Sequence, residues 1–158
     1  MKAVDPVIAT VIIVAVTVAV AIAVALWMTG LVGGFTGTEN LQIVNAYAVA
    51  TSSPSSGWNV TLQVKNAGTT TATIDQIFIN GIPYSSVSVT SPSTLTVTVS
   101  VGNTAFSSIP LSPGNSTTIT IFIPQGTGTP LSFDSGQQVE IKLHTASGKT
   151  YPVQVVLP

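Results

Sequence analysis

The 158-residue sequence contains no cysteine and no arginine, and its only ionisable side chains besides tyrosine are four lysines, five carboxylates and one histidine. The lack of cysteine excludes disulfide bonds, thiolate metal ligands and cysteine nucleophiles. Charged residues make up 6% of the chain, whereas roughly a quarter is usual in a globular domain. The few lysines are dispersed and the net charge is −1, so we expect no nucleic-acid partner.

Few residues are available for catalysis or for metal binding. A hydrolase triad would have to use His144, which alternation places on the polar face of a strand together with Glu140 and Lys142. No Gly-x-Ser-x-Gly motif is present, and one histidine without thiolates cannot form a histidine- or cysteine-based zinc site. We therefore predict that the chain is not an enzyme and uses no cofactor or metal.

What the sequence does contain is a long apolar segment near its N-terminus. Between Val7 and Met28 the only polar side chains are Thr10 and Thr17, and a helix of this length is roughly 33 Å long, enough to span a bilayer. We predict a helix over residues 4–34, because in an apolar environment the backbone must satisfy its own hydrogen bonds. Asp5 is predicted to cap this helix and Pro6 to fit its first turn. Three glycines are predicted to stop it and to form a hinge: Gly30, Gly33 and Gly34.

The composition changes after the apolar segment. Residues 35–40 are predicted to be a connector, and residues 41–158 alternate apolar and polar side chains with the period of two that is typical of half-buried strands. We predict an immunoglobulin-like β-sandwich of seven or eight strands without further helices. The expected strands are 41–49, 58–65, 73–79, 86–90, 94–101, 117–123, 139–144 and 150–157.

Three interpretations of the apolar segment compete. A secretory signal peptide, with a cleavage site at Ala23-Val24-Ala25, is disfavoured because the segment is longer than the roughly 7–15 apolar residues of such signals. A permanent single-span anchor would hold an immunoglobulin-like, glycan- or ligand-binding domain at the cell surface. The third interpretation is an assembly element, in which each helix buries its apolar surface against other copies of the chain.

Residues 1–16, with Lys2-Ala3 followed by Asp5-Pro6-Val7-Ile8, resemble the N-terminal signature of archaeal type IV pilins. The resemblance implies that a prepilin peptidase removes a leader, residues 1–3, by cleaving between Ala3 and Val4. The mature subunit would leave the cytoplasmic membrane with the help of a pilus assembly machinery and join an extracellular filament that mediates adhesion. The filament would be a homopolymer with these helix-bundle core residues: Val7, Ile8, Val11, Ile12, Val14, Ala15, Val18, Ile22 and Leu26.

One departure from bacterial type IV pilins concerns the fifth mature position. Those pilins usually have a glutamate there, whereas this chain has Ile8 and carries its acidic residue, Asp5, at the second mature position. Capping of its own helix is the expected role of Asp5, because it needs no partner. Archaellins begin this helix with a glycine-rich segment, so the resemblance favours an adhesion pilus over a swimming filament.

The remaining candidate sites lie in the second region. Asn59-Val60-Thr61 and Asn115-Ser116-Thr117 match the acceptor pattern for N-glycosylation, so Asn59 and Asn115 are candidate glycan sites if this region is extracellular. Trp58 begins an alternating strand and is expected in the core.

Overall fold

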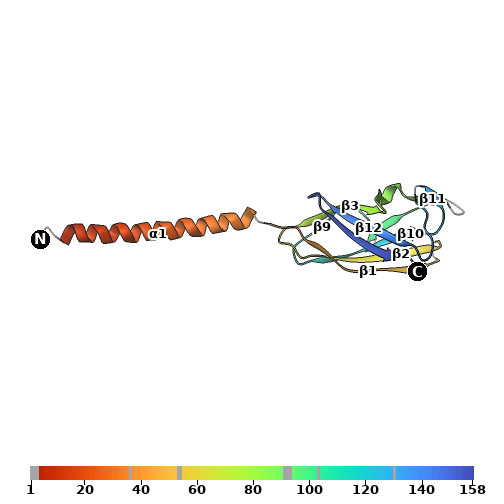
Figure 1. The fold of residues 1–158 in the computed structure, drawn as a ribbon, viewed down its shortest axis with the longest axis horizontal. Helices are drawn as coiled ribbons and strands as arrows, with labels where there is room; N and C mark the ends of the chain where they lie inside the picture. The colour runs from red at the N-terminus through yellow and green to blue at the C-terminus, as the bar shows by residue number, and fades with distance from the viewer. Residues whose placement is uncertain (1–3, 36, 53–54, 91–93, 103, 130) are drawn as a thin grey trace. The chain divides into compact units, whose positions relative to one another are not determined.

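The structure is a computed structural model that describes residues 4–35, 37–52, 55–90, 94–102, 104–129 and 131–158. It divides between Gly37 and Thr38 into an N-terminal helical unit and a C-terminal all-β unit (Figure 1). The helical unit is a single helix, α1 (Val4–Phe35). The predicted leader residue Ala3 lies outside the described residues, and for Val4 and Asp5 only the helical backbone is described.

The helix ends one residue beyond the predicted range 4–34. The helix α1 continues through Gly30, Gly33 and Gly34 and ends at Phe35. A glycine still donates and accepts helical hydrogen bonds, and it costs only about 1 kcal/mol relative to alanine inside a helix. Nothing lies within 4 Å of where a Cβ would be on Gly30, so no packing constraint requires a glycine at this position. Whether the three glycines act as a hinge remains a prediction.

The β unit contains antiparallel strands and one short 3-10 turn, η1 (Tyr84–Ser86). Seven strands of the described residues have four or more residues, and the others are shorter. In chain order the strands are β1 (Leu41–Thr51), β2 (Gly57–Asn66), β3 (Ala72–Ile79), β4 (Ile82–Pro83), β5 (Ser88–Thr90), β6 (Thr94–Thr96), β7 (Thr98–Val101), β8 (Thr104–Ala105), β9 (Ile109–Leu111), β10 (Ser116–Pro124), β11 (Gly128–Thr129), β12 (Gln138–Thr145) and β13 (Thr150–Val156).

Two larger sheets and one small sheet make up this unit. The first, which we call the β2 sheet, has the order β1-β2-β10-β7-β8. The second, the β12 sheet, has the order β13-β12-β3-β4, with β9 pairing with the other end of β3. The small sheet is β11-β5-β6. The architecture confirms the predicted long apolar helix followed by an all-β domain.

The predicted single strand over residues 94–101 is wrong. Its first part, β6, pairs with β5 in the small sheet, whereas its second part, β7, pairs with β10 in the β2 sheet. Val97 lies at the break, and its N–H donates to the carbonyl oxygen of Val87 (3.3 Å). Its side chain is only 3% exposed, and Val99 in β7 is buried as well.

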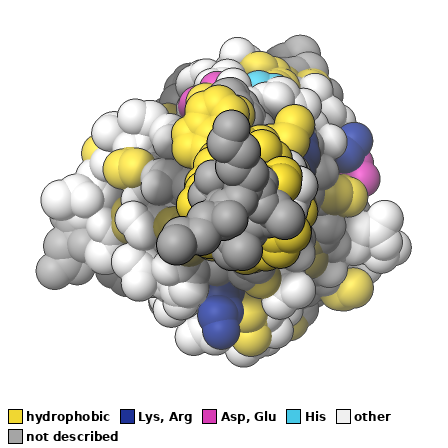
Figure 2. Space-filling model, turned by 90° about the vertical axis from the view of Figure 1, so that its left-hand side faces the viewer, with side chains coloured by type: hydrophobic (Ala, Val, Ile, Leu, Met, Phe, Trp, Pro, Cys, Tyr) yellow, Lys and Arg dark blue, Asp and Glu magenta, His cyan; other side chains and the backbone are white. Residues whose placement is uncertain are grey.

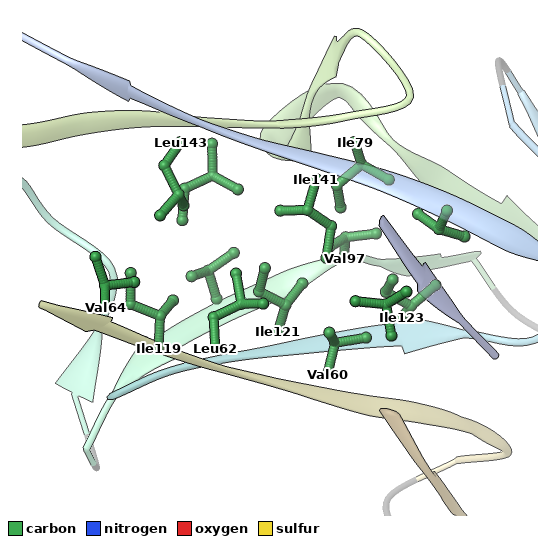
Figure 3. Packing of buried hydrophobic residues seen from close by; sticks show 14 of the residues in the cluster. Val60, Leu62, Val64, Ile79, Val97, Ile119, Ile121, Ile123, Ile141 and Leu143 are labelled. Atoms are coloured by element: carbon green, nitrogen blue, oxygen red, sulfur yellow. The ribbon is translucent and has the colours of Figure 1, made fainter. Parts of the chain in front are cut away.

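The core lies between the two larger sheets (Figure 3). Figure 3 shows apolar side chains of β2 and β10 pointing toward those of β3 and β12. These strands alternate buried residues with more exposed ones, as their sequences predict. The predicted core residue Trp58 is 2% exposed, and its Nε1–H donates to the carbonyl oxygen of Pro158 (2.8 Å).

Candidate functional site

The apolar surface of α1 is the largest unburied apolar feature of the described chain. The residues predicted to form the helix-bundle core are exposed along the whole helix. Val7 near its start is 60% exposed, and Leu26 near its end is 68% exposed. A helical wheel places Val7, Val11, Val14, Ala15, Val18, Ile22 and Leu26 on one face of α1, at 100° per residue. The structure contains one copy of the chain, so their packing in a bundle remains a prediction.

The opposite face of α1 is just as apolar, and the predicted core set omits it. Ile13, Val16 and Val20 lie there, each more than half exposed. A helix that is apolar all round is suited to complete burial, whereas a helix with one apolar stripe packs on one side only. The absence of charged residues over residues 6–38 was the sequence signal for the whole surface.

The threonine side chains of α1 bind to the helix itself. Thr10 Oγ1 donates to the carbonyl oxygen of Val7 (2.8 Å), and Thr17 Oγ1 donates to that of Ile13 (2.6 Å). Thr29 Oγ1 lies 3.0 Å from the carbonyl oxygens of both Ala25 and Leu26. Because these hydroxyls have internal partners, they can enter an apolar environment without the penalty of an unpaired donor.

The segment Pro6–Val32 has 27 residues and is long and apolar enough to cross a membrane, and its most apolar stretch of 18 residues has a mean hydropathy of 3.1. Its length as a helix is roughly 40 Å, compared with about 30 Å for the hydrocarbon core of a bilayer. This length and composition fit a membrane anchor and a helix stored in lipid before assembly equally well.

The segment that precedes β1 is fixed to two turns of the β unit. Thr38 accepts from the N–H of Thr69 (2.8 Å), and Asn40 accepts from that of Ala67 (2.8 Å). Lys149 Nζ donates to the carbonyl oxygen of Glu39 (2.7 Å), and the Glu39 carboxylate accepts from Ser147. The predicted connector 35–40 therefore contains a stretch, residues 38–40, that belongs to the β unit.

Asn66 organises this end of the domain. It is fully buried, and its Nδ2 donates to the carbonyl oxygens of Thr70 (2.8 Å) and Leu111 (2.7 Å), while Oδ1 accepts from Gly68 N–H (2.9 Å). A Cβ on Gly68 would lie 2.3 Å from the Thr38 carbonyl oxygen, so the close approach requires glycine. The turn 66–68 and the segment 111–115 are thus joined, a contact that sequence reasoning did not predict.

The two candidate glycan sites have different surroundings. Asn115 is exposed in the turn before β10, whereas Asn59 is half-buried near the start of β2. Asn59 is opposite Val49 on one side and Phe122 on the other. Glycan acceptors are typically found in surface loops, so Asn115 is the more accessible site.

The polar strand face that carries His144 contains one ion pair and one contact between a histidine and a carboxylate. His144 Nδ1 lies 2.7 Å from Asp75 Oδ1, and Lys142 Nζ lies 3.0 Å from Glu140 Oε2. His144 also packs edge-on against Phe78, with ring centroids 6.3 Å apart. Among the described residues, no group of three or more histidine or acidic side chains could hold a metal ion.

No protein-family model matches the chain, and no curated protein matches it. Among solved structures, the archaeal flagellum of Methanospirillum hungatei strain JF1 is 19% identical, with a TM-score of 0.43, over 99% of this chain and 92% of that chain. The Iho670 flagellar-like filament is 16% identical, with a TM-score of 0.41, over 96% and 98% of the two chains.

The archaellum periplasmic stator protein FlaG from Sulfolobus acidocaldarius is 19% identical, with a TM-score of 0.36, over 74% of this chain and 99% of that chain. At these identities and TM-scores, the three likenesses do not assign a function to the chain.

Proposed function

We propose that the chain is the structural subunit of an extracellular filament of the type IV pilus class, a homopolymer held together by α1. The observation that carries the proposal is the surface of α1, which is apolar on all sides and has internal partners for its threonines. Such a helix cannot remain exposed to water. Burial of a large apolar side chain contributes about 1.5–3 kcal/mol, so packing against neighbouring helices would make the polymer hard to dissociate.

The N-terminal signature supports a pathway for assembly. A prepilin peptidase cleaves between Ala3 and Val4, the membrane holds α1 before assembly, and the assembly machinery transfers the subunit to the filament. The start of the helix resembles pilins rather than archaellins, which favours adhesion as the role of the filament. The exposed Asn115 is the better candidate for an N-linked glycan on the outside of the cell.

The test is filament formation by a charge variant of the helix, Val16→Asp, compared with Val16→Leu. An aspartate at the centre of an apolar helix costs about 2.5–3.5 kcal/mol in a bilayer, and every subunit of a helical bundle would carry it. We expect sheared filaments from cells producing wild type or Val16→Leu, and a loss of on the order of a hundredfold for Val16→Asp. Filaments of normal yield from Val16→Asp would exclude α1 as the assembly core.

Mass spectrometry of the sheared material tests the processing step. A chain that begins at Val4 in a sedimentable, detergent-free fraction is the expected product. The same spectra report whether the peptides of Asn59 and Asn115 carry additional mass.

A single-span surface protein with a glycan- or ligand-binding β domain is the second candidate, because Pro6–Val32 is long enough to cross a membrane. Extraction distinguishes the two. An anchored monomer remains with the membrane until detergent is added and keeps its first residues, whereas a filament subunit is released by shear.

A further inference from the structure

The outer faces of the two larger sheets differ in charge. On the β12 sheet, β3 and β12 present four titratable side chains, Asp75, Glu140, Lys142 and His144, which form the ion pair and the histidine–carboxylate contact described above. On the outer face of the β2 sheet, the described residues of β1, β2, β7 and β10 include a single charged side chain, Lys65. Figure 2 shows one side of the molecule, on which charged side chains are few.

We call the outer face of the β2 sheet the neutral face. The register of the strands places hydroxyl and amide side chains side by side across it, such as Asn45, Gln63 and Thr118 in one row. The face consists of Gln42, Asn45, Tyr47 and Val49 from β1, Asn59, Thr61, Gln63 and Lys65 from β2, Ser116, Thr118, Thr120 and Phe122 from β10, and Thr98 and Ser100 from β7.

Exposed apolar side chains are concentrated at one edge of the neutral face. Val44, Tyr47 and Val49 all belong to β1 and are 64%, 45% and 53% exposed. In the described part of the β unit, the only other large apolar side chain that is so exposed is Val156. Val44 lies at an irregularity in the pairing of β1 with β2, and it lines a groove of about 240 Å³ together with Gln63, Lys65 and Thr118.

We propose that the neutral face is a subunit contact, and that its partner is the β domain of a second copy of this chain. The inference rests on the proposed filament function and names the surface through which the β domains would meet.

The electrostatics of the two faces favour this partner. Bringing the β12 sheet into a contact would remove water from four titratable groups, and each would need a matching group on the partner. Hydroxyl and amide groups can exchange water for hydrogen bonds to a similar surface, and the exposed valines and tyrosine gain from burial. In a homopolymer every neighbour is another copy of this chain at high local concentration, and the neutral face carries little charge that such a neighbour would have to match.

The charged face then has a different task. Charged side chains on an exposed strand face keep the outside of a polymer hydrated and oppose association between neighbouring polymers. The separation of the two kinds of side chain onto two sheets thus corresponds to an inner and an outer side of the β domain in the filament.

The experiment uses the absence of cysteine from the chain, which makes any introduced thiol unique. Gln63→Cys places a thiol on the neutral face, and Gln154→Cys places one on the outer face of the β12 sheet. Both positions are exposed strand glutamines in the single subunit. Each variant is produced as the full chain, and labelling by a polyethylene-glycol maleimide is compared between intact sheared filaments and subunits dissociated in detergent.

We expect the thiol of Gln63→Cys to react at least about tenfold more slowly in filaments than in dissociated subunits, because the contact excludes the bulky reagent. Gln154→Cys should react at similar rates in both states. Equal rates for Gln63→Cys in both states would overturn the proposed contact while leaving the filament function intact.

Two other outcomes also overturn the inference. Slow labelling of Gln63→Cys even in dissociated subunits would mean that the neutral face is covered by a glycan on Asn59 or by another ligand rather than by a second copy. Recovery of the wild-type chain only from membranes, with no sheared filaments, would remove the proposed function as well, and the two failures are therefore distinguishable.

Discussion

The two units of the chain use the same side chains in opposite ways. In the β unit, Ile119, Ile121 and Ile123 are completely buried, because β10 alternates them with side chains that face outward. In α1, Ile12 and Ile13 are 56% and 63% exposed, because no polar stripe gives the helix an inside and an outside. The β unit completes its core within one chain, whereas α1 has no partner within one chain.

This difference separates folding from assembly. The buried residues that define the β fold lie between its own sheets, and α1 forms a compact unit of its own. A substitution in the β unit is therefore expected to alter its folding stability and to leave assembly through α1 unchanged. A substitution in α1 is expected to do the reverse. The predictions below test this separation, beginning with the change that should have the largest effect.

The same truncation in the two units gives the most direct comparison. Ile121→Ala should lower the free energy of unfolding of the β domain by about 2–5 kcal/mol, since it leaves a cavity in the core. Ile13→Ala should leave that free energy unchanged, because it removes the same atoms from an exposed helix position. The Tm of detergent-solubilised full chain should fall by on the order of 10 °C for Ile121→Ala only.

Tryptophan fluorescence can isolate the β domain in this measurement. The chain has two tryptophans, and Trp58 is 2% exposed whereas Trp27 on α1 is 67% exposed. In a Trp27→Phe background the signal therefore reports the β core alone. A fall in Tm caused by Ile13→Ala would show that the two units are energetically coupled and would break the comparison.

The next effect concerns Asn66, the buried polar residue beside the segment that precedes β1. Asn66→Asp retains the shape of the side chain but replaces the amide that donates to Thr70 and Leu111 by a carboxylate oxygen. Each buried carbonyl left without its donor costs about 1–3 kcal/mol, and the buried charge adds to this. Thermal unfolding should show a marked loss of stability near neutral pH.

Asn115→Asp is the matched control for this substitution. Asn115 is exposed, so the same chemical change should alter the stability by less than about 0.5 kcal/mol. Equal losses for the two variants would mean that the hydrogen bonds of Asn66 do not stabilise this end of the domain.

Much of the fold could be predicted from periodicity. The strands 41–49, 58–65, 117–123 and 139–144 agree with β1, β2, β10 and β12 because alternation over many residues specifies which face is buried. The strands β4, β8, β9 and β11 have only two or three residues and no periodic signal. Asn80 and Gly81 form the turn between β3 and β4, and both have positive φ, 48° and 83°, which asparagine and glycine tolerate better than other residues.

The candidate site was predictable to a lesser extent. The apolar surface of α1 follows from the lack of charge in its sequence. The neutral face depends on the order of strands in the β2 sheet, which places β1 and β10 on either side of β2 although they are distant in sequence. Strand order is set by packing across the whole domain, so no local pattern could indicate that the charged residues would gather on the other sheet.

The smallest expected effect concerns those charged residues. Lys142 and Glu140 are about one-third exposed, and a double-mutant cycle with Lys142→Met and Glu140→Gln should give a coupling of about 0.2–1 kcal/mol that decreases with added salt. The measurement is thermal unfolding of dissociated subunits at low and high salt. A coupling above about 2 kcal/mol would assign these charges to the stability of the fold. A small coupling would show that the two charges contribute little to the stability of the fold. Their placement on the β12 sheet is then better explained by the cost of removing charged groups from water in a contact at the neutral face.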